Sequence, residues 1–263
     1  TTDRYPKVRS RRVGSATVIG FAKGAGMIEP SMGTMLAFLM TDAVVDREIL
    51  QKLLTQAVQL SFNRISVDSD QSTSDMALAL SSQQVEAVPQ EELSDAIVEV
   101  CLDLAEDIVR NGEGVEHVIK VSVSAPGTED GTVAIGKAIV NSPLVKTAIF
   151  GNDPNVGRIV SAIGDHLGAQ ELPHLLASST LNIGGINVYK QGSFRLDGTK
   201  EAALTKYLNE RRIDHTLDYP PHDRVVEIEV DFDSSTKSRN VEAVVLGADL
   251  SHGYVTENAD YRS

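Results

Sequence analysis

A run of small residues ends at a threonine between Lys23 and Met35, and its residue types suit covalent chemistry better than any other part of the sequence. The run reads Lys23-Gly-Ala-Gly-Met-Ile-Glu-Pro-Ser-Met-Gly-Thr34. Pro30 stiffens the loop, and Gly33 leaves the peptide bond before Thr34 sterically open. After the threonine the sequence becomes abruptly apolar. Taken alone, this pattern is more typical of a loop that enters a buried strand or helix than of a reactive site.

Other patterns with chemical meaning are incomplete. The glycines at 20–26 are followed by no Gly-Lys-Ser/Thr, and the G-x-G-x-x-G spacing of a dinucleotide site fails at Glu29. The segment that starts with Asp68 and Asp70 begins like a calcium loop, but Thr73 stands where the turn needs glycine. The six histidines show no H-x-x-x-H spacing and no neighbouring cysteine, and the chain has no G-x-S-x-G elbow. We therefore expect neither a metal site nor a nucleotide site.

The composition is that of an ordinary soluble globular chain. Of its 263 residues, 41% are hydrophobic and 23% charged, which provides a substantial core. The net charge of −13 repels phosphate backbones and anionic lipid, so we expect neither nucleic acid nor a membrane as partner. The single cysteine, Cys101, rules out an intrachain disulfide and suits a reducing compartment. We expect a cytoplasmic protein, with an organellar signal upstream of Thr1 left open.

Two amphipathic helices dominate the first part of the chain. Apolar residues at helical spacing predict them over Asp46–Leu60 and Glu91–Arg110, and Gly112 is expected to close the second. A short apolar piece at Val13–Phe21 predicts a strand or hairpin, and Phe62–Val67 predicts a further strand.

The pattern changes to mixed α/β near 112–116, which divides the chain into expected domains of 1–114 and 115–263. Alternating apolar residues at 119–123 predict a half-buried strand, the first of an expected βαβ-type unit. The other predicted elements are a helix at 130–141, a strand at Val145–Phe150, a helix at Val156–Leu167 starting from Asp153-Pro154, strands near 180–189, 224–232 and 241–246, and a helix near 200–209.

Six further segments carry motifs in order along the chain. They are Thr-Thr-Asp-x-x-Pro-Lys at 1–7, Ser-Phe-Asn-Arg-Ile-Ser-Val-Asp-Ser-Asp-Gln-Ser-Thr-Ser-Asp at 61–75, Gly-Glu-Gly at 112–114, Asn-Ser-Pro-Leu-Val-Lys-Thr-Ala at 141–148, Gly-Asn-Asp-Pro-Asn-Val-Gly-Arg at 151–158 and Ala-Asp-Leu-Ser-x-x-Tyr-Val-x-x-Asn at 248–258. Together with the run that ends at Thr34, they resemble the ornithine acetyltransferase (glutamate N-acetyltransferase) family, whose members cut themselves before a threonine. The chain departs from the family in having Gly33 where alanine is usual and Val156 where tryptophan is usual.

The resemblance implies self-cleavage between Gly33 and Thr34. The Thr34 hydroxyl attacks the Gly33 carbonyl, the acyl group moves from nitrogen to oxygen, and water cleaves the ester. The freed α-amino group, with an ordinary pKa of about 7.7–8.0, then serves as general base for the hydroxyl of the same residue. That hydroxyl takes an acetyl group from N2-acetylornithine and passes it to glutamate. The implied activity is a ping-pong acyltransferase with an acetyl-Thr34 intermediate.

The same resemblance implies a set of substrate contacts and no metal or cofactor, with acetyl-CoA left open as an alternative acetyl donor. Besides Thr34, the matching positions are Thr1, Lys23, Glu113, Asn258 and Ser263. The lysine suits an α-carboxylate and the glutamate suits an ammonium group, whereas the remaining three supply neutral hydrogen bonds.

The implied fold is an α/β layered sandwich with two sheets between helices, plus a C-terminal α/β domain whose tail returns to the active site. Members of the family carry a region before Thr-Thr-Asp that holds the oxyanion-hole donors. That half, on the same polypeptide or on a partner chain, is expected to complete the site in an (αβ)2 heterotetramer. Three alternatives remain: a related N-acyltransferase of a specialised pathway with a different donor or acceptor, an N-terminal-nucleophile aminopeptidase, and a non-catalytic assembly subunit.

Overall fold

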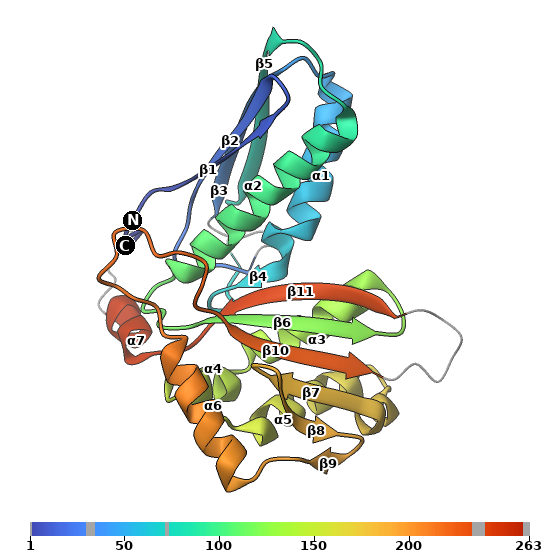
Figure 1. Cartoon of the computed structure of the whole chain (residues 1–263), viewed down its shortest axis with the longest axis vertical. Helices are drawn as coiled ribbons and strands as arrows, with labels where there is room; N and C mark the ends of the chain where they lie inside the picture. Colours follow the sequence, from blue (N-terminus) through green and yellow to red (C-terminus); the bar gives the residue numbers. More distant parts are fainter. Residues whose placement is uncertain (1, 30–34, 72–73, 233–239, 260–263) are drawn as a thin grey trace. The chain divides into compact units, whose positions relative to one another are not determined.

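The chain forms two compact units, Thr1–Glu113 and Gly114–Ser263, so the division lies one residue from the boundary expected from the sequence. The computed structural model describes residues 2–29, 35–71, 74–232 and 240–259. Each unit contains one sheet and its own helices (Figure 1). The expected mixed α/β class is confirmed.

A four-stranded sheet forms the first unit. Its strand order is β1 (Lys7–Val13), β2 (Ala16–Lys23), β3 (Leu36–Ala43) and β5 (Met76–Val85). β1 and β2 form a hairpin, β3 runs antiparallel to β2, and β5 runs parallel to β3. The hairpin turns at Gly14, whose φ of 56° favours glycine.

Two helices, α1 (Arg47–Leu60) and α2 (Gln90–Arg110), cover one face of this sheet (Figure 1). The contact is close because β2 presents glycine there: a Cβ at Gly20 would lie 2.7 Å from Val100 and 2.8 Å from Leu104 of α2. After α1 the chain makes a short 3-10 turn, η1 (Phe62–Arg64), and a two-residue strand, β4 (Ile65–Ser66).

The second unit is built on a mixed sheet. Its strands follow the order β11 (Val241–Ala248), β6 (Val118–Ala125), β10 (Val226–Phe232), β7 (Ser179–Ile183), β8 (Ile186–Lys190) and β9 (Ser193–Phe194). Its helices are α3 (Glu129–Asn141), α4 (Pro143–Phe150), α5 (Val156–Ala169), the 3-10 turn η2 (Pro173–Ser178), α6 (Gly198–Glu210) and α7 (His252–Ala259). Aliphatic side chains from the sheet and from α3 to α6 form one buried core.

A buried histidine–aspartate pair lies within this second unit. His117 and Asp249 are both inaccessible to solvent, and Nδ1 of the histidine lies 2.8 Å from Oδ2 of the aspartate. Asp249 also accepts the N–H of Glu116 at 2.9 Å, and Nε2 of His117 lies 3.2 Å from the carbonyl oxygen of Leu208. Because both ring nitrogens face acceptors, the pair ties the start of β6 to the chain that follows β11 and to α6.

The structure corrects four predictions of local structure. Val145–Phe150 lies in a helix rather than a strand, because Ser142 caps it and Pro143 occupies its first position. The strand parallel to β6 is therefore β10, not the expected segment. The α5 helix is capped by Asn155 rather than Asp153. Gly112 has no positive φ at the end of α2, whereas Gly114 has a φ of 64°.

No single helix among the described residues is long and apolar enough to cross a membrane. The pair α3 and α4 reaches that length and composition only jointly, with a bend of 56° between its members.

Candidate active site

Three strand ends of the first unit meet beside the segment that carries the predicted nucleophile. The last residue of β2, Lys23, pairs with Leu36 at the start of β3, and Leu36 pairs with Met76 at the start of β5. Thr34 and Gly33 lie outside the described residues. Because Met35 is bonded to Thr34, the chain enters β3 from the predicted cleavage site at this end of the sheet.

The residue after Thr34 is held on both sides of its backbone. The N–H of Met35 donates to Oδ1 of Asp75 at 2.5 Å, and the N–H of Met76 donates to the carbonyl oxygen of Met35 at 3.0 Å. The side chain of Met35 is 3% exposed. The backbone N–H and carbonyl of Met35 are therefore both fixed, by Asp75 and by Met76.

A lysine acts electrostatically on a carboxyl group at this end of the sheet. Burial raises the pKa of the Asp75 carboxyl above its usual value, whereas the N–H of Met35 and the positive charge of Lys23 act in the opposite direction. The Lys23 side chain is exposed. A cation and a carboxylate thus lie within electrostatic range of each other where the predicted nucleophile enters β3.

Glu113 is held against the loop that leaves β2. Its N–H donates to the carbonyl oxygen of Ala25 at 2.9 Å, and its carboxylate accepts the hydroxyl of Thr2 at 2.7 Å. A Cβ at Gly26 would lie only 2.3 Å from Oε2 of Glu113, so glycine is what allows the carboxylate to sit there. The loop that starts one residue after Lys23 therefore packs directly against the predicted ammonium-binding carboxylate of Glu113.

Asp68 fixes the other end of this loop. Its two carboxylate oxygens accept the N–H groups of Met27 at 2.7 Å and Ile28 at 2.9 Å, and Val67 donates to the carbonyl oxygen of Ile28 at 2.7 Å. Met27 has a φ of 57°, a conformation that these bonds compensate. In the acidic segment that begins like a calcium loop, the first carboxylate, that of Asp68, thus accepts hydrogen bonds from backbone N–H groups.

The N-terminal segment completes the surroundings of Lys23. Lys7 is buried and pairs with Asp3, whose carboxylate also accepts the N–H of Gly24 at 3.1 Å. Burial lowers the pKa of Lys7, while the bond to Asp3 acts in the opposite direction. A pocket of about 350 Å³ lies beside this pair and is lined by Asp3, Arg4, Tyr5, Pro6, Ala22 and Lys23.

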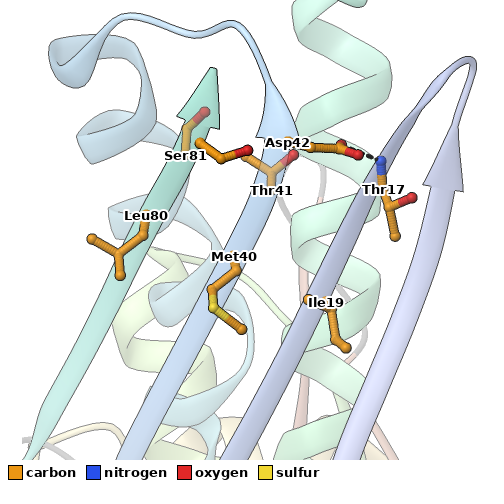
Figure 2. Close-up of a pocket in the computed structure, with 8 residues that line it drawn as sticks. Thr17, Ile19, Met40, Thr41, Asp42, Leu80 and Ser81 are labelled. Carbon is orange, nitrogen blue, oxygen red and sulfur yellow. Dashed lines mark hydrogen bonds between the residues drawn. The ribbon is translucent and has the colours of Figure 1, made fainter. Parts of the chain in front are cut away.

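The sheet face away from α1 and α2 is apolar and open, and we call it the outer face. Its large exposed side chains are Val8, Phe21, Met40, Met76, Leu78 and Leu80. Figure 2 shows part of it, where Ile19, Met40 and Leu80 lie on three adjacent strands around a pocket of about 480 Å³. At the rim, Oδ1 of Asp42 accepts the N–H of Thr17 at 2.7 Å (Figure 2). Large apolar side chains exposed together on one sheet face are typical of a surface that binds another polypeptide, a membrane or a ligand.

Of the site residues predicted from the sequence, two lie next to the same loop in the described structure, one lies in the second unit, and four are not described. Lys23 and Glu113 both lie at the loop after β2. Asn258 lies on α7 of the second unit, where its Nδ2 donates to the carbonyl oxygen of Tyr254 at 3.1 Å. Thr1, Gly33, Thr34 and Ser263 are outside the described residues, although the neighbour of Thr1, Thr2, contacts Glu113.

Sequence reasoning missed Asp75 and the strand that follows it. The signal was present, because large and small apolar residues alternate over 76–80, as in a strand with one open face. With β5 predicted, Asp75 would have been recognised as the polar residue directly before the strand. Within the described part of the chain, no three His, Cys, Asp or Glu side chains are grouped so as to hold a metal ion.

Comparison with known proteins gives a consistent result. The family model described as "ArgJ family" matches residues 1–263. The arginine biosynthesis bifunctional protein ArgJ of Rhodococcoides fascians is 38% identical over 261 residues, which cover 99% of this chain and 60% of that protein. The ArgJ 2 protein of Clostridium acetobutylicum is 49% identical over 164 residues, which cover 62% of this chain and 42% of that protein.

A solved structure is similar as well. The crystal structure of the arginine biosynthesis bifunctional protein ArgJ from Bacillus halodurans superimposes with a TM-score of 0.71 at 32% identity, covering 87% of this chain and 100% of that one. The chain spans less than two thirds of the length of the curated relatives named above.

Proposed function

The chain belongs to the ArgJ family, and on that premise we propose that it carries the nucleophile of an acyltransferase that moves an acetyl group from N2-acetylornithine to glutamate. The observation that carries the proposal is the family match over residues 1–263. The fixed backbone of Met35 beside Lys23 supports it, because a nucleophile must be presented at a defined position next to its substrate.

The first chemical step is self-cleavage before Thr34. The Thr34 oxygen forms a bond to the Gly33 carbonyl carbon, the carbon–nitrogen bond breaks, and the nitrogen takes up a proton to become an amine. Water then hydrolyses the ester, which leaves a carboxylate on Gly33 and regenerates the hydroxyl. The buried anchor at Met35 supports this step, since it holds the leaving side of the bond while the acyl side moves.

The second step is acyl transfer through Thr34. The free α-amine accepts the hydroxyl proton as the oxygen attacks the acetyl carbonyl of N2-acetylornithine, and the proton passes to the departing ornithine nitrogen. Glutamate then attacks the acetyl ester by the reverse sequence and leaves as N-acetylglutamate. This scheme uses no metal and no cofactor, and acetyl-CoA remains an alternative donor for the same ester.

Substrate recognition follows from the two charges at the loop after β2. Lys23 ends β2 and binds the α-carboxylate, and Glu113 binds an ammonium group of the donor. Thr1, Asn258 and Ser263 supply further hydrogen bonds. A chain of net charge −13 needs such a local cation, because its overall field repels an amino-acid carboxylate.

The outer face binds the portion of the family's length that this chain does not span. That portion is more than a third of the curated relatives named above, long enough to supply a second sheet. The outer face is continuous with the site, because Lys23 and Met76 lie at the end of the strands that form it. We expect this portion to complete the sandwich, to provide the oxyanion-hole donors and to assemble as an (αβ)2 heterotetramer in the cytoplasm.

Substitution of Thr34 in the full-length protein tests the proposal. Thr34→Ala should abolish both the cut and acetyl transfer, whereas Thr34→Ser should retain cleavage and part of the activity because an amine and a hydroxyl survive. Mass spectrometry reports the cut, and initial rates with N2-acetylornithine and glutamate report transfer. Uncut wild-type protein with full activity would refute the assignment of Thr34.

A panel of acyl donors and acceptors separates the proposed reaction from its relatives. Preference for N2-acetylornithine and glutamate supports the proposed activity. Preference for another acylated amino acid would place the chain in a specialised pathway, and release of amino acids from peptides would indicate an aminopeptidase. Protein that is neither cut nor active would support the assembly-subunit alternative.

A further inference from the structure

The pocket beside the pair of Lys7 and Asp3 has a positively charged wall. Its volume of about 350 Å³ falls in the range of small-molecule sites, roughly 300–1,000 Å³. Among the residues that line it, Arg4 and Lys23 are cations and Asp3 is an anion. Since Asp3 pairs with the buried Lys7, the wall is positive within a chain of net charge −13. Such a local reversal of sign favours an anionic ligand.

Hydrogen bonds fix the chain segment that carries Arg4. The N–H of Arg4 donates to Oδ1 of Asn111, the residue after α2, at 3.0 Å. Oδ1 of Asp3 accepts the N–H of Gly24, the residue after β2, at 3.1 Å. The segment is thus tied to the ends of a helix and a strand of the first unit. Because these bonds do not involve the Arg4 side chain, a substitution of that side chain leaves them in place.

Like charges act on each other beside this pocket. Burial is the main cause that lowers the pKa of Lys7, and the positive charge of Lys23 acts in the same direction. The two ammonium groups are therefore within electrostatic range, at the wall that also carries Arg4. A bound carboxylate relieves such repulsion, since it places negative charge among the cations.

Two cations in one pocket wall suit a ligand with two carboxylates. In the proposed reaction the acceptor is such a ligand, because glutamate carries a side-chain carboxylate besides the α-carboxylate assigned to Lys23. The side chain of the donor, N2-acetylornithine, ends instead in an ammonium group. The planar guanidinium of arginine binds a carboxylate through two parallel hydrogen bonds, which gives geometric selectivity as well as charge.

We propose that Arg4 determines the acceptor specificity: its guanidinium binds the side-chain carboxylate of glutamate in this pocket while Lys23 binds the α-carboxylate. This inference rests on the proposed function, since it needs glutamate as the acetyl acceptor. The donor's ammonium group belongs to Glu113 and the acceptor's second carboxylate to Arg4, so different residues bind the two side chains of opposite charge. Loss of the Arg4 charge therefore affects the acceptor half of the ping-pong reaction.

Glutamine is the test acceptor, because it has the shape of glutamate without the side-chain charge. In the full-length protein, the ratio of kcat/KM for glutamate to kcat/KM for glutamine measures the preference. We expect Arg4→Gln to lower this ratio at least about tenfold, through the KM for glutamate, and to change kcat/KM for N2-acetylornithine less than about threefold. Arg4→Lys retains the charge without the planar fork, so its ratio should lie between those of wild type and Arg4→Gln.

Arg12→Gln is the matched control. Arg12 is exposed and pairs with Thr17 at one end of the β1–β2 hairpin, whereas Lys7 pairs with Ala22 at the end beside the pocket. The control has the same net charge as Arg4→Gln, so an effect of overall charge would appear in both variants. We expect the ratio of Arg12→Gln to match that of wild type.

The outcomes distinguish this inference from the proposed function. Wild-type protein that transfers no acetyl group from N2-acetylornithine to glutamate would overturn both. Active wild-type protein that uses glutamine as well as glutamate, or an Arg4→Gln variant whose ratio matches that of Arg12→Gln, would overturn the role of Arg4 alone. Equal losses with glutamate, glutamine and N2-acetylornithine would also overturn it, because a purely structural residue gives that result.

Discussion

Gly26 holds open the space in which the Glu113 carboxylate sits, and Gly26→Ala tests whether that placement serves substrate binding. The new methyl group would lie 2.3 Å from Oε2 and 2.6 Å from Cδ of Glu113. Ordinary contacts begin near 3.4 Å. The carboxylate must therefore retreat by roughly 1 Å, while the backbone at 26 needs no positive φ and accepts alanine.

Two consequences of that displacement differ in size. Retreat of the carboxylate breaks its 2.7 Å bond from Thr2, a partly buried charge-assisted bond whose loss costs about 1.5–3 kcal/mol. Replacing glycine stiffens the unfolded chain and offsets about 0.4–1 kcal/mol of this. Stability should fall by only about 1–2 kcal/mol, but a 1 Å error in a positioning group can lower kcat/KM about 100-fold.

The assay measures kcat/KM for N2-acetylornithine and the thermal midpoint of Gly26→Ala beside two comparisons. Glu113→Gln should lose a similar amount of kcat/KM, since it removes the charge itself. Gly168→Ala, where no atom lies within 4 Å of the new methyl, should be unchanged in activity. If Gly26→Ala kept kcat/KM within threefold of wild type while Glu113→Gln lost it, the placement argument would be wrong; if both kept it, Glu113 would not bind substrate.

Three further predictions concern charge and burial. Lys23→Met should lower kcat/KM roughly 30-fold or more and leave the cut intact, and a change below threefold would show a surface lysine without a substrate role. Asp249→Ala should destabilise the second unit by about 3–5 kcal/mol, because it leaves His117 buried without its carboxylate, and chemical denaturation measures this loss. Burial raises the pKa of the Cys101 thiol to about 12, so iodoacetamide at pH 8 should modify it only after unfolding, as read by mass.

The helices of the first unit were predictable because their apolar residues repeat at helical spacing over long windows. α1 and α2 begin and end within one residue of the predicted ranges. Shorter elements were less predictable. The apolar run at 143–150 is compatible with strand or helix, and the caps at Ser142 and Pro143 decide for helix.

The candidate site was predictable only in part, because it depends on contacts between residues distant in sequence. Lys23 and Glu113 could be named from the family motifs. The clamp of Asp75 on Met35 joins residues 40 positions apart and exists only once β3 and β5 pair in parallel, a pairing that no local pattern specifies. The same holds for Asp68, whose bonds to the loop after β2 also span about 40 positions.

The central claim is that Thr34 becomes a chain start and carries the acetyl group. Intact-mass measurement of the full-length wild-type protein, incubated with N2-acetylornithine in the absence of glutamate, tests it directly. We expect a fragment that begins at Thr34 and carries an added mass of about 42 Da, the size of one acetyl group, which disappears when glutamate is added. An uncut chain, or a cut fragment that never gains this mass while acetyl transfer proceeds, would contradict it.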